Sequence, residues 1–137
     1  MKSFFTIMTL IMVYNPCWSQ GQVYIEQNSL DSVVVITQIG GNHSTSLNIQ
    51  TSQVVGYVQQ SGSASHSATI DVSGGIHAFN ITQSGDVSAS KTFNLSMSGT
   101  GGNATIVQTS PGTQEQAGMR VTCIGPCPAG TWQYIRR

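Results

Sequence analysis

Charged residues are scarce in this chain: five acidic and five basic side chains among 137 residues, or 7% of the total. A soluble monomer ordinarily has more surface charge, because like charges keep copies apart. No basic patch is large enough to predict a nucleic-acid partner. The carboxylates are scattered along the chain, and no Ser-His-Asp order, carboxylate pair or metal-ligand cluster stands out. We therefore expect neither an enzyme nor a bound cofactor.

Long apolar runs are also lacking, apart from one at the N-terminus. Phe4 to Tyr14 follow the basic Lys2 and are interrupted only by two threonines. This run is too short for a membrane-spanning helix, which needs about 20 apolar residues. Small residues at Cys17 and Ser19 follow it, a pattern typical of a secretory signal. We predict that residues 1–19 are a signal peptide and that the remaining chain is secreted.

Cysteine is rare, and of the three cysteines Cys17 lies within the predicted signal peptide. The other two, Cys123 and Cys127, are expected to form a local disulfide in an oxidising environment. A zinc site would need two further ligands, and none lies nearby in the sequence. A redox role is disfavoured because the spacing is not Cys-x-x-Cys.

Residues 119–137 are predicted to form a distinct basic segment that contains this cysteine pair. Its charged side chains are all basic: Arg120, Arg136 and Arg137. These arginines are candidates for an anchor to an anionic cell surface or to an accessory factor.

No part of the chain after the signal shows a sustained helical period. Ser, Thr, Gly, Asn and Gln dominate, as they do in many disordered segments, but a fixed repeat argues against disorder. The unit Gln-x-Gly recurs at intervals of 22 and 23 residues, and a degenerate copy ends at Gln108. The three full copies are Gln38/Gly40, Gln60/Gly62 and Gln83/Gly85.

Alternating apolar residues between these units predict short strands, separated by glycine and serine turns about every 11 residues. Such strands bury a face only when successive turns of a coil stack on one another. We predict an all-β fold for residues 20–118: an amyloid-like β-solenoid of strand-turn-strand rungs, with about 22–23 residues per turn. The predicted core residues are Val34, Ile36, Leu47, Ile49, Val58, Ile70, Phe79, Ile81, Phe93, Leu95 and Ile106.

The repeated glutamines are predicted to point inward and to hydrogen-bond from rung to rung, as amide ladders do in cross-β structures. The alternative is that they are solvated polar residues between strands. The predicted ladder positions are Gln38, Gln60, Gln83 and Gln108, with Ser32 at the start of the repeat. Asp71 and Asn94 follow an apolar residue directly, so we expect their side chains to face outward.

Glycines and histidines recur at the same period. Gly40, Gly62 and Gly85 are predicted to occupy turns with positive φ, a conformation that only glycine adopts freely. His43 and His66 are predicted to form a stacked pair on the surface. A metal site is the alternative, but only His77 could complete it, and His77 lies at a different phase of the repeat.

The residues Ser32-x5-Gln38-x-Gly40 resemble the start of the repeat of the curlin family, whose members form curli, the extracellular amyloid fibres of Gram-negative bacteria. The resemblance extends over about residues 22 to 122 as a periodic pattern. The match is imperfect, since His43 occupies the asparagine position of the repeat and Ile49 its closing glutamine position.

Residues 104–108 and 116–122 resemble the end of the minor curlin, which nucleates polymerisation of the major subunit at the cell surface. The resemblance implies a secreted fimbrial subunit with no cofactor. Its partners would be copies of itself, a second curlin-like subunit, and export and anchoring proteins at the outer-membrane surface. The alternatives are a major fibre subunit and a monomeric β-solenoid adhesin.

Overall fold

The computed structural model describes residues 7–13, 21–27, 31–50, 53–86, 88–123 and 131–137. Within these residues every regular element is a β-strand. The described part of the chain thus has no helix that is long and apolar enough to cross a membrane. Successive strands alternate between two parallel sheets, so the predicted all-β solenoid of stacked coils is confirmed.

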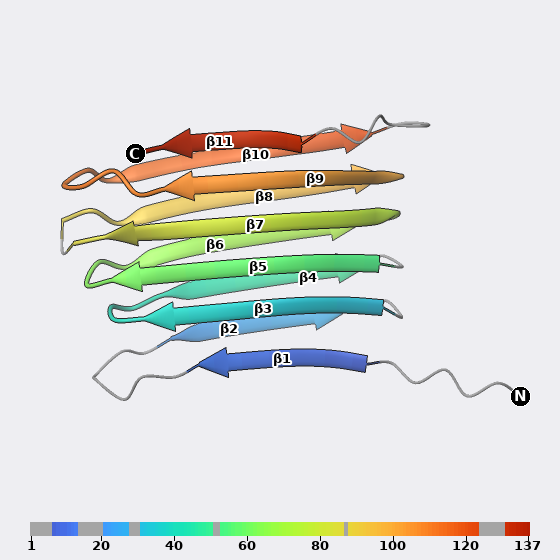
Figure 1. Cartoon of the computed structure of the whole chain (residues 1–137), viewed down its shortest axis with the longest axis horizontal. Helices are drawn as coiled ribbons and strands as arrows, with labels where there is room; N and C mark the ends of the chain where they lie inside the picture. Colours follow the sequence, from blue (N-terminus) through green and yellow to red (C-terminus); the bar gives the residue numbers. More distant parts are fainter. Residues whose placement is uncertain (1–6, 14–20, 28–30, 51–52, 87, 124–130) are drawn as a thin grey trace, which may run out of the picture.

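The two sheets lie one behind the other, and their strands run in opposite directions (Figure 1). Sheet A has the order β1 (Ile7–Val13), β3 (Asp31–Ile39), β5 (Gln53–Gly62), β7 (Ile76–Gly85), β9 (Gly101–Gln108) and β11 (Thr131–Arg136). Sheet B has the order β2 (Gln22–Gln27), β4 (Ser44–Gln50), β6 (His66–Ser73), β8 (Lys91–Gly99) and β10 (Glu115–Cys123). Each pair from β2/β3 to β10/β11 therefore forms one rung.

Side chains alternate between a buried and an outer face along the strands, as in β4 and β5. All the predicted core residues are buried, the most exposed being Val34 at 7%. They line the space between the sheets in columns, because parallel pairing places equivalent residues side by side on successive rungs. The column Ile36, Val58, Ile81 and Ile106 is one example.

One column combines very different side-chain volumes. Gly56 lies between Val34 and Phe79 on neighbouring strands. A Cβ added to Gly56 would lie 2.2 Å from the Phe79 ring. The Phe79 ring therefore fills the space that the missing side chain leaves, and the column stays close-packed.

Two glycines of the Gln-x-Gly units have the predicted positive φ, with values of 85° at Gly40 and 108° at Gly62. The prediction is wrong for Gly85, which does not have a positive φ. At Gly85 there is instead no room for a side chain, because an added Cβ would lie 2.6 Å from the carbonyl oxygen of Ala89. Close approach of the next loop, and not a left-handed turn, accounts for this glycine.

The sheets also extend through both predicted segment boundaries. Residues 7–13 of the predicted signal peptide form β1, which pairs with β3 at one end of sheet A. At the other end, β10 runs across the predicted boundary between residues 118 and 119, and β11 pairs with β9. The backbone of the basic segment thus continues both sheets.

The Gly56–Phe79 contact gives a test of the packing. Gly56→Ala is expected to destabilise the fold by about 1–3 kcal/mol, because a methyl group would overlap the ring. Phe79→Leu in the same chain should recover part of that loss, although Phe79→Leu alone creates a cavity. Denaturation midpoints of the two single variants and the double variant give the coupling energy. Additive effects would contradict the contact.

Candidate functional site

The repeated glutamines form a continuous hydrogen-bonded row through sheet A. The Nε2 atom of Gln38 donates to Oε1 of Gln60 at 2.9 Å. Gln60 donates in the same way to Gln83, and Gln83 to Gln108, each at 2.8 Å. Gln60, Gln83 and Gln108 are fully buried. All donors point towards the C-terminal end, so the row has a direction.

Each interior amide also bonds to the opposite sheet. The second hydrogen of the Gln60 amide goes to the carbonyl of Ser44 at 3.1 Å, and that of Gln83 to the carbonyl of Ser67 at 3.1 Å. Thr45 donates its hydroxyl hydrogen to Oε1 of Gln60 at 2.9 Å. The amides are therefore satisfied despite their burial, which offsets the free energy lost by removing them from water.

The ladder prediction is wrong for Ser32, whereas Asp71 and Asn94 face outward as expected. Ser32 is buried, but its neighbours on successive rungs are Val54 and His77, so its column has no repeated amide. Asp71 and Asn94 are exposed on the outer face of sheet B.

A second buried polar column lies where the strands of sheet B begin. The rings of His43 and His66 stack with centroids 5.0 Å apart and planes 3° from parallel. Both side chains are 1% exposed, so the predicted stack exists but its predicted surface location is wrong. Each Nε2 donates to a carbonyl at the end of the preceding sheet A strand, Ile39 for His43 and Ser61 for His66.

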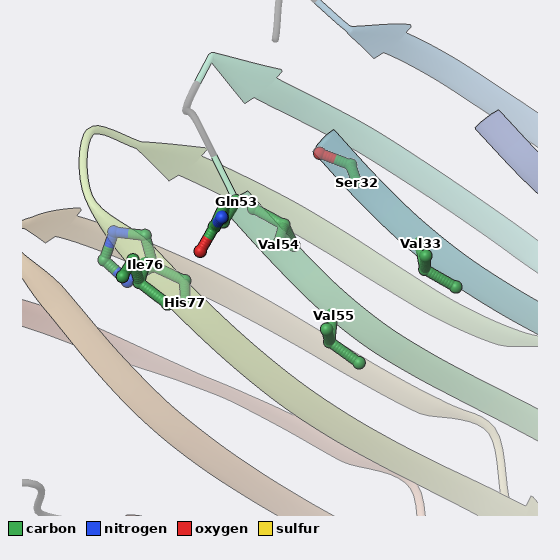
Figure 2. Close-up of a pocket in the computed structure, with 7 residues that line it drawn as sticks. All are labelled: Ser32, Val33, Gln53, Val54, Val55, Ile76 and His77. Atoms are coloured by element: carbon green, nitrogen blue, oxygen red, sulfur yellow. The ribbon is translucent and has the colours of Figure 1, made fainter. Parts of the chain in front are cut away.

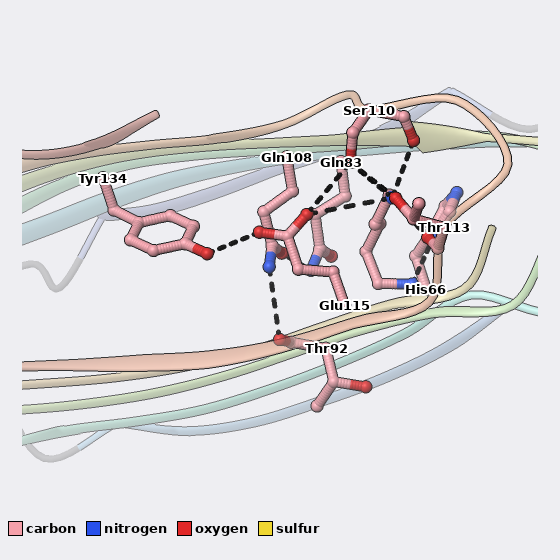
Figure 3. A network of polar contacts seen from close by, with 9 residues as sticks. His66, Gln83, Thr92, Gln108, Ser110, Thr113, Glu115 and Tyr134 are labelled. Carbon is pink, nitrogen blue, oxygen red and sulfur yellow. Dashed lines mark hydrogen bonds and ion pairs between the residues drawn. The ribbon is translucent and has the colours of Figure 1, made fainter. Parts of the chain in front are cut away.

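Lys91 takes the next position of this column, and Glu115 the one after it. The Lys91 side chain is fully buried, and its ammonium group donates to the carbonyls of Ser110 at 2.8 Å and Thr113 at 2.6 Å. The carboxylate of Glu115 lies 3.8 Å away. The turn between β9 and β10 thus encloses the cation. Figure 3 shows Ser110 and Thr113 of this turn near Glu115.

The Glu115 carboxylate joins the two polar columns at the C-terminal end. Tyr134 of β11 donates its phenol hydrogen to it at 2.5 Å, and Ser110 donates at 3.2 Å. Burial opposes ionisation of Glu115. Hydrogen bonds from Tyr134 and from Gln108 of the amide row outweigh burial and lower the pKa of the carboxyl group. Glu115 is therefore a carboxylate at neutral pH, while the amide of Gln108 donates to the carbonyl of Thr92 at 3.4 Å.

Burial also holds the two histidines in the neutral form. Nδ1 of His66 accepts a hydrogen bond from the backbone N–H of Lys91 at 3.1 Å, which assigns the ring proton to Nε2. Removal from water, with the neighbouring His43 ring, lowers the pKa of His66 to about 4. Removal from water also lowers the pKa of His43.

His77 occupies a different environment, beside a shallow hollow of about 320 Å³ at the start of the sheet A strands (Figure 2). Its ring is buried, and among the described residues neither ring nitrogen has a hydrogen-bond partner. The rest of the hollow is largely apolar, with Val33, Val55 and Ile76 exposed around it. The described residues contain no group of three metal-ligating side chains.

The remaining predicted site residues lie in the C-terminal segment. Arg120, Arg136 and Arg137 are all exposed. Cys127 and the side chain of Cys123 are outside what the structure describes, so the disulfide stays a prediction.

Comparison with known protein families, curated proteins and solved structures gives no match to this chain. The fold and the candidate site therefore rest on the residues of this chain alone.

The sequence analysis missed the Lys91–Glu115 pair. Lys91 follows His66 by 25 residues and Glu115 follows Lys91 by 24, each close to the repeat interval. The column His43, His66, Lys91 and Glu115 was therefore available as a signal. The repeat was recognised from identical residues, whereas this column changes from imidazole to ammonium to carboxylate.

The amide row is tested by two neighbouring glutamines of β5, since Gln60 is buried in the row and Gln59 is exposed. Gln60→Ala removes the donor to the buried Oε1 of Gln83 and the acceptor of the Gln38 amide. It should cost several kcal/mol, at roughly 1–3 kcal/mol for each group. Gln59→Ala should change stability by less than about 0.5 kcal/mol. Chemical denaturation of both variants makes the comparison, and equal losses would refute the ladder.

The histidine stack gives a pH dependence. An unfolded chain takes up a proton at an ordinary imidazole pKa near 6.5, whereas folded His66 does so only near pH 4. Between these values the unfolded state binds more protons, so stability falls as the pH is lowered from about 6.5 to about 4. His66→Gln should reduce this loss.

Denaturation midpoints measured across the range test the assignment. His77→Gln is the control, because it replaces a buried histidine that lies outside the stack and should leave the change of stability with pH as in the wild type. An unchanged slope in His66→Gln would contradict the assignment.

Proposed function

We propose that this chain is a secreted structural subunit of extracellular curli-type amyloid fibres, and that it nucleates polymerisation at the cell surface by templating strands on its open edge. The observation that supports this most directly is the unbroken amide row from Gln38 to Gln108 within parallel, in-register sheets. Stacked identical amides at the strand spacing are the characteristic side-chain pairing of cross-β assemblies.

Growth by templating follows from the geometry of the end strands. A terminal strand of a sheet presents backbone N–H and C=O groups without partners in that sheet, and proteins that stay monomeric usually block such edges. Here the strands of both sheets run parallel and in register up to the last rung. An added strand would gain backbone hydrogen bonds on each residue and apolar contacts on its inner face. No chemical reaction is assigned to the chain.

The C-terminal end favours a nucleator over a major subunit. The regular succession of rungs changes there, where the turn between β9 and β10 encloses Lys91 and Glu115 receives Tyr134. Three exposed arginines gather at the same end, namely Arg120, Arg136 and Arg137. Exposed cations near an anionic surface contribute about 1 kcal/mol each. In the copy whose C-terminal end is left open, these cations would hold the chain to the outer membrane or to an anchoring protein. The partner that grows on the other end is a second curlin-like subunit.

Assembly of the purified exported chain tests the proposal. It should form fibres that bind amyloid dyes and diffract at the two cross-β spacings, about 4.8 Å and 10 Å. Its fibres should also shorten the lag phase of a curlin-like partner subunit.

A chain that remains a folded monomer at high concentration, with no such reflections, would contradict the assembly proposal. That result would favour the monomeric adhesin. Fibres that fail to shorten the partner's lag phase would favour the major-subunit alternative.

A further inference from the structure

The outer face of sheet B has a column whose charge changes sign from one end to the other. Strand register places five residues in this column, in the order Glu26, Asn48, Asp71, Ser96 and Arg120. Glu26 lies on β2, the first strand of the sheet, and Arg120 on β10, the last. Both end residues are exposed. The two ends of the sheet therefore carry opposite charges at equivalent positions.

In the neighbouring outer column, the side chain at one end of the sheet is complementary in shape to the space at the other end. It runs from Tyr24 on β2 to Gly118 on β10. Tyr24 is 60% exposed, and its hydroxyl group donates to the Glu26 carboxylate at 3.1 Å. At the opposite end, Gly118 and Arg120 border a hollow of about 360 Å³. A large aromatic side chain thus projects at one end, and a missing side chain leaves space at the other.

We propose that a second copy of this chain stacks on the first with its β2 beside β10, in the register that places Glu26 next to Arg120 and Tyr24 next to Gly118. The proposal rests on the proposed function and adds the residues that specify the joint between copies. In this register the oppositely charged side chains are one strand spacing apart, about 4.8 Å. The Tyr24 ring enters the space beside Gly118.

These two contacts select one register among several that burial alone would allow. A slip of one residue turns every side chain to the wrong face, but a slip of two residues keeps the apolar residues inside. After such a slip Glu26 would lie beside Gly118 or Thr122, away from Arg120. The Glu26–Arg120 pair therefore gives the joint its register and its head-to-tail direction.

Sheet A is compatible with the same joint once the predicted signal peptide is removed, because β1 belongs to that segment and covers β3. Without β1, the described strands number five in each sheet, and β3 of one copy follows β11 of another. Oε1 of Gln38 points to this end and lies against Gly21. Arg136 occupies the amide-row position on β11. Its guanidinium group would donate to Gln38 of the next copy and so continue the row.

Charge reversal in the exported protein tests the joint through the rate at which seeds of each variant elongate. Glu26→Lys and Arg120→Glu should each slow elongation roughly fivefold or more, because like charges then face each other. The double variant restores the pair in reversed order and should return to within about twofold of the wild-type rate. The slowing should diminish as salt is added.

Asp86→Lys is the matched control, since it makes the same change in net charge as Glu26→Lys at an exposed position between β7 and β8, away from the joint. Slowing of this control to the same extent, or failure of the double variant to recover, would overturn the joint. Wild-type fibres would still support the proposed function in that case, whereas absence of wild-type fibres would refute the function itself.

A cysteine pair provides a second measurement that does not depend on growth rate. In Glu26→Cys/Arg120→Cys the two residues are four strands apart within one copy, about 19 Å, which is too far for a disulfide. Oxidised fibres should therefore yield covalent multimers whose mapped cross-link joins residues 26 and 120. A cross-link that maps elsewhere, or multimers no more abundant than in wild-type fibres, would overturn the proposed register.

Discussion

Hydrogen bonding between glutamine amides on successive rungs is the interaction on which the register of this coil depends. Each of the first three amides of the row is bonded to the next one and to a backbone carbonyl or a hydroxyl group, so a slip of any strand would leave buried polar atoms without partners. Apolar columns tolerate such slips better, because a valine fits beside an isoleucine in several registers. The row therefore supplies the specificity, while the apolar residues supply most of the stabilisation.

The amide row also explains how turns of different length are accommodated. Successive glutamines are separated by 22, 23 and 25 residues. Since the strands stay in register, the added residues lie in the connections between strands. The longest interval includes the loop that precedes β8, where Ala89 approaches Gly85 closely. Variation in the length of the turns is thus confined to the edges of the sheets, and the strands remain continuous.

Two periodicities made the strands, the core and the amide row predictable: the two-residue alternation within a strand and the repeat of about 22 residues. The first can be recognised within a few consecutive residues, and the second from identical residues one repeat apart. The errors concern interactions that depend on how connections fold. The histidines were expected on the surface, but the turns direct them between the sheets. The Lys91 site was missed because the β9–β10 turn supplies its acceptors. Gly85 is required by the close approach of a neighbouring loop and not by its own φ.

Differences in side chains among the rungs prevent a strand from pairing one whole rung out of place. If every rung were identical, a strand could pair one whole rung out of place without loss, and copies could mispair in the same way. In this chain Phe79 fits the space beside Gly56, and Lys91 fits only the position enclosed by the β9–β10 turn. Exchange of neighbouring rungs would take Lys91 away from the carbonyls of this turn, or would place the Phe79 ring against another side chain. The shared amide row thus allows rungs to be added at an end, and the unequal side chains give each rung inside the chain a single place.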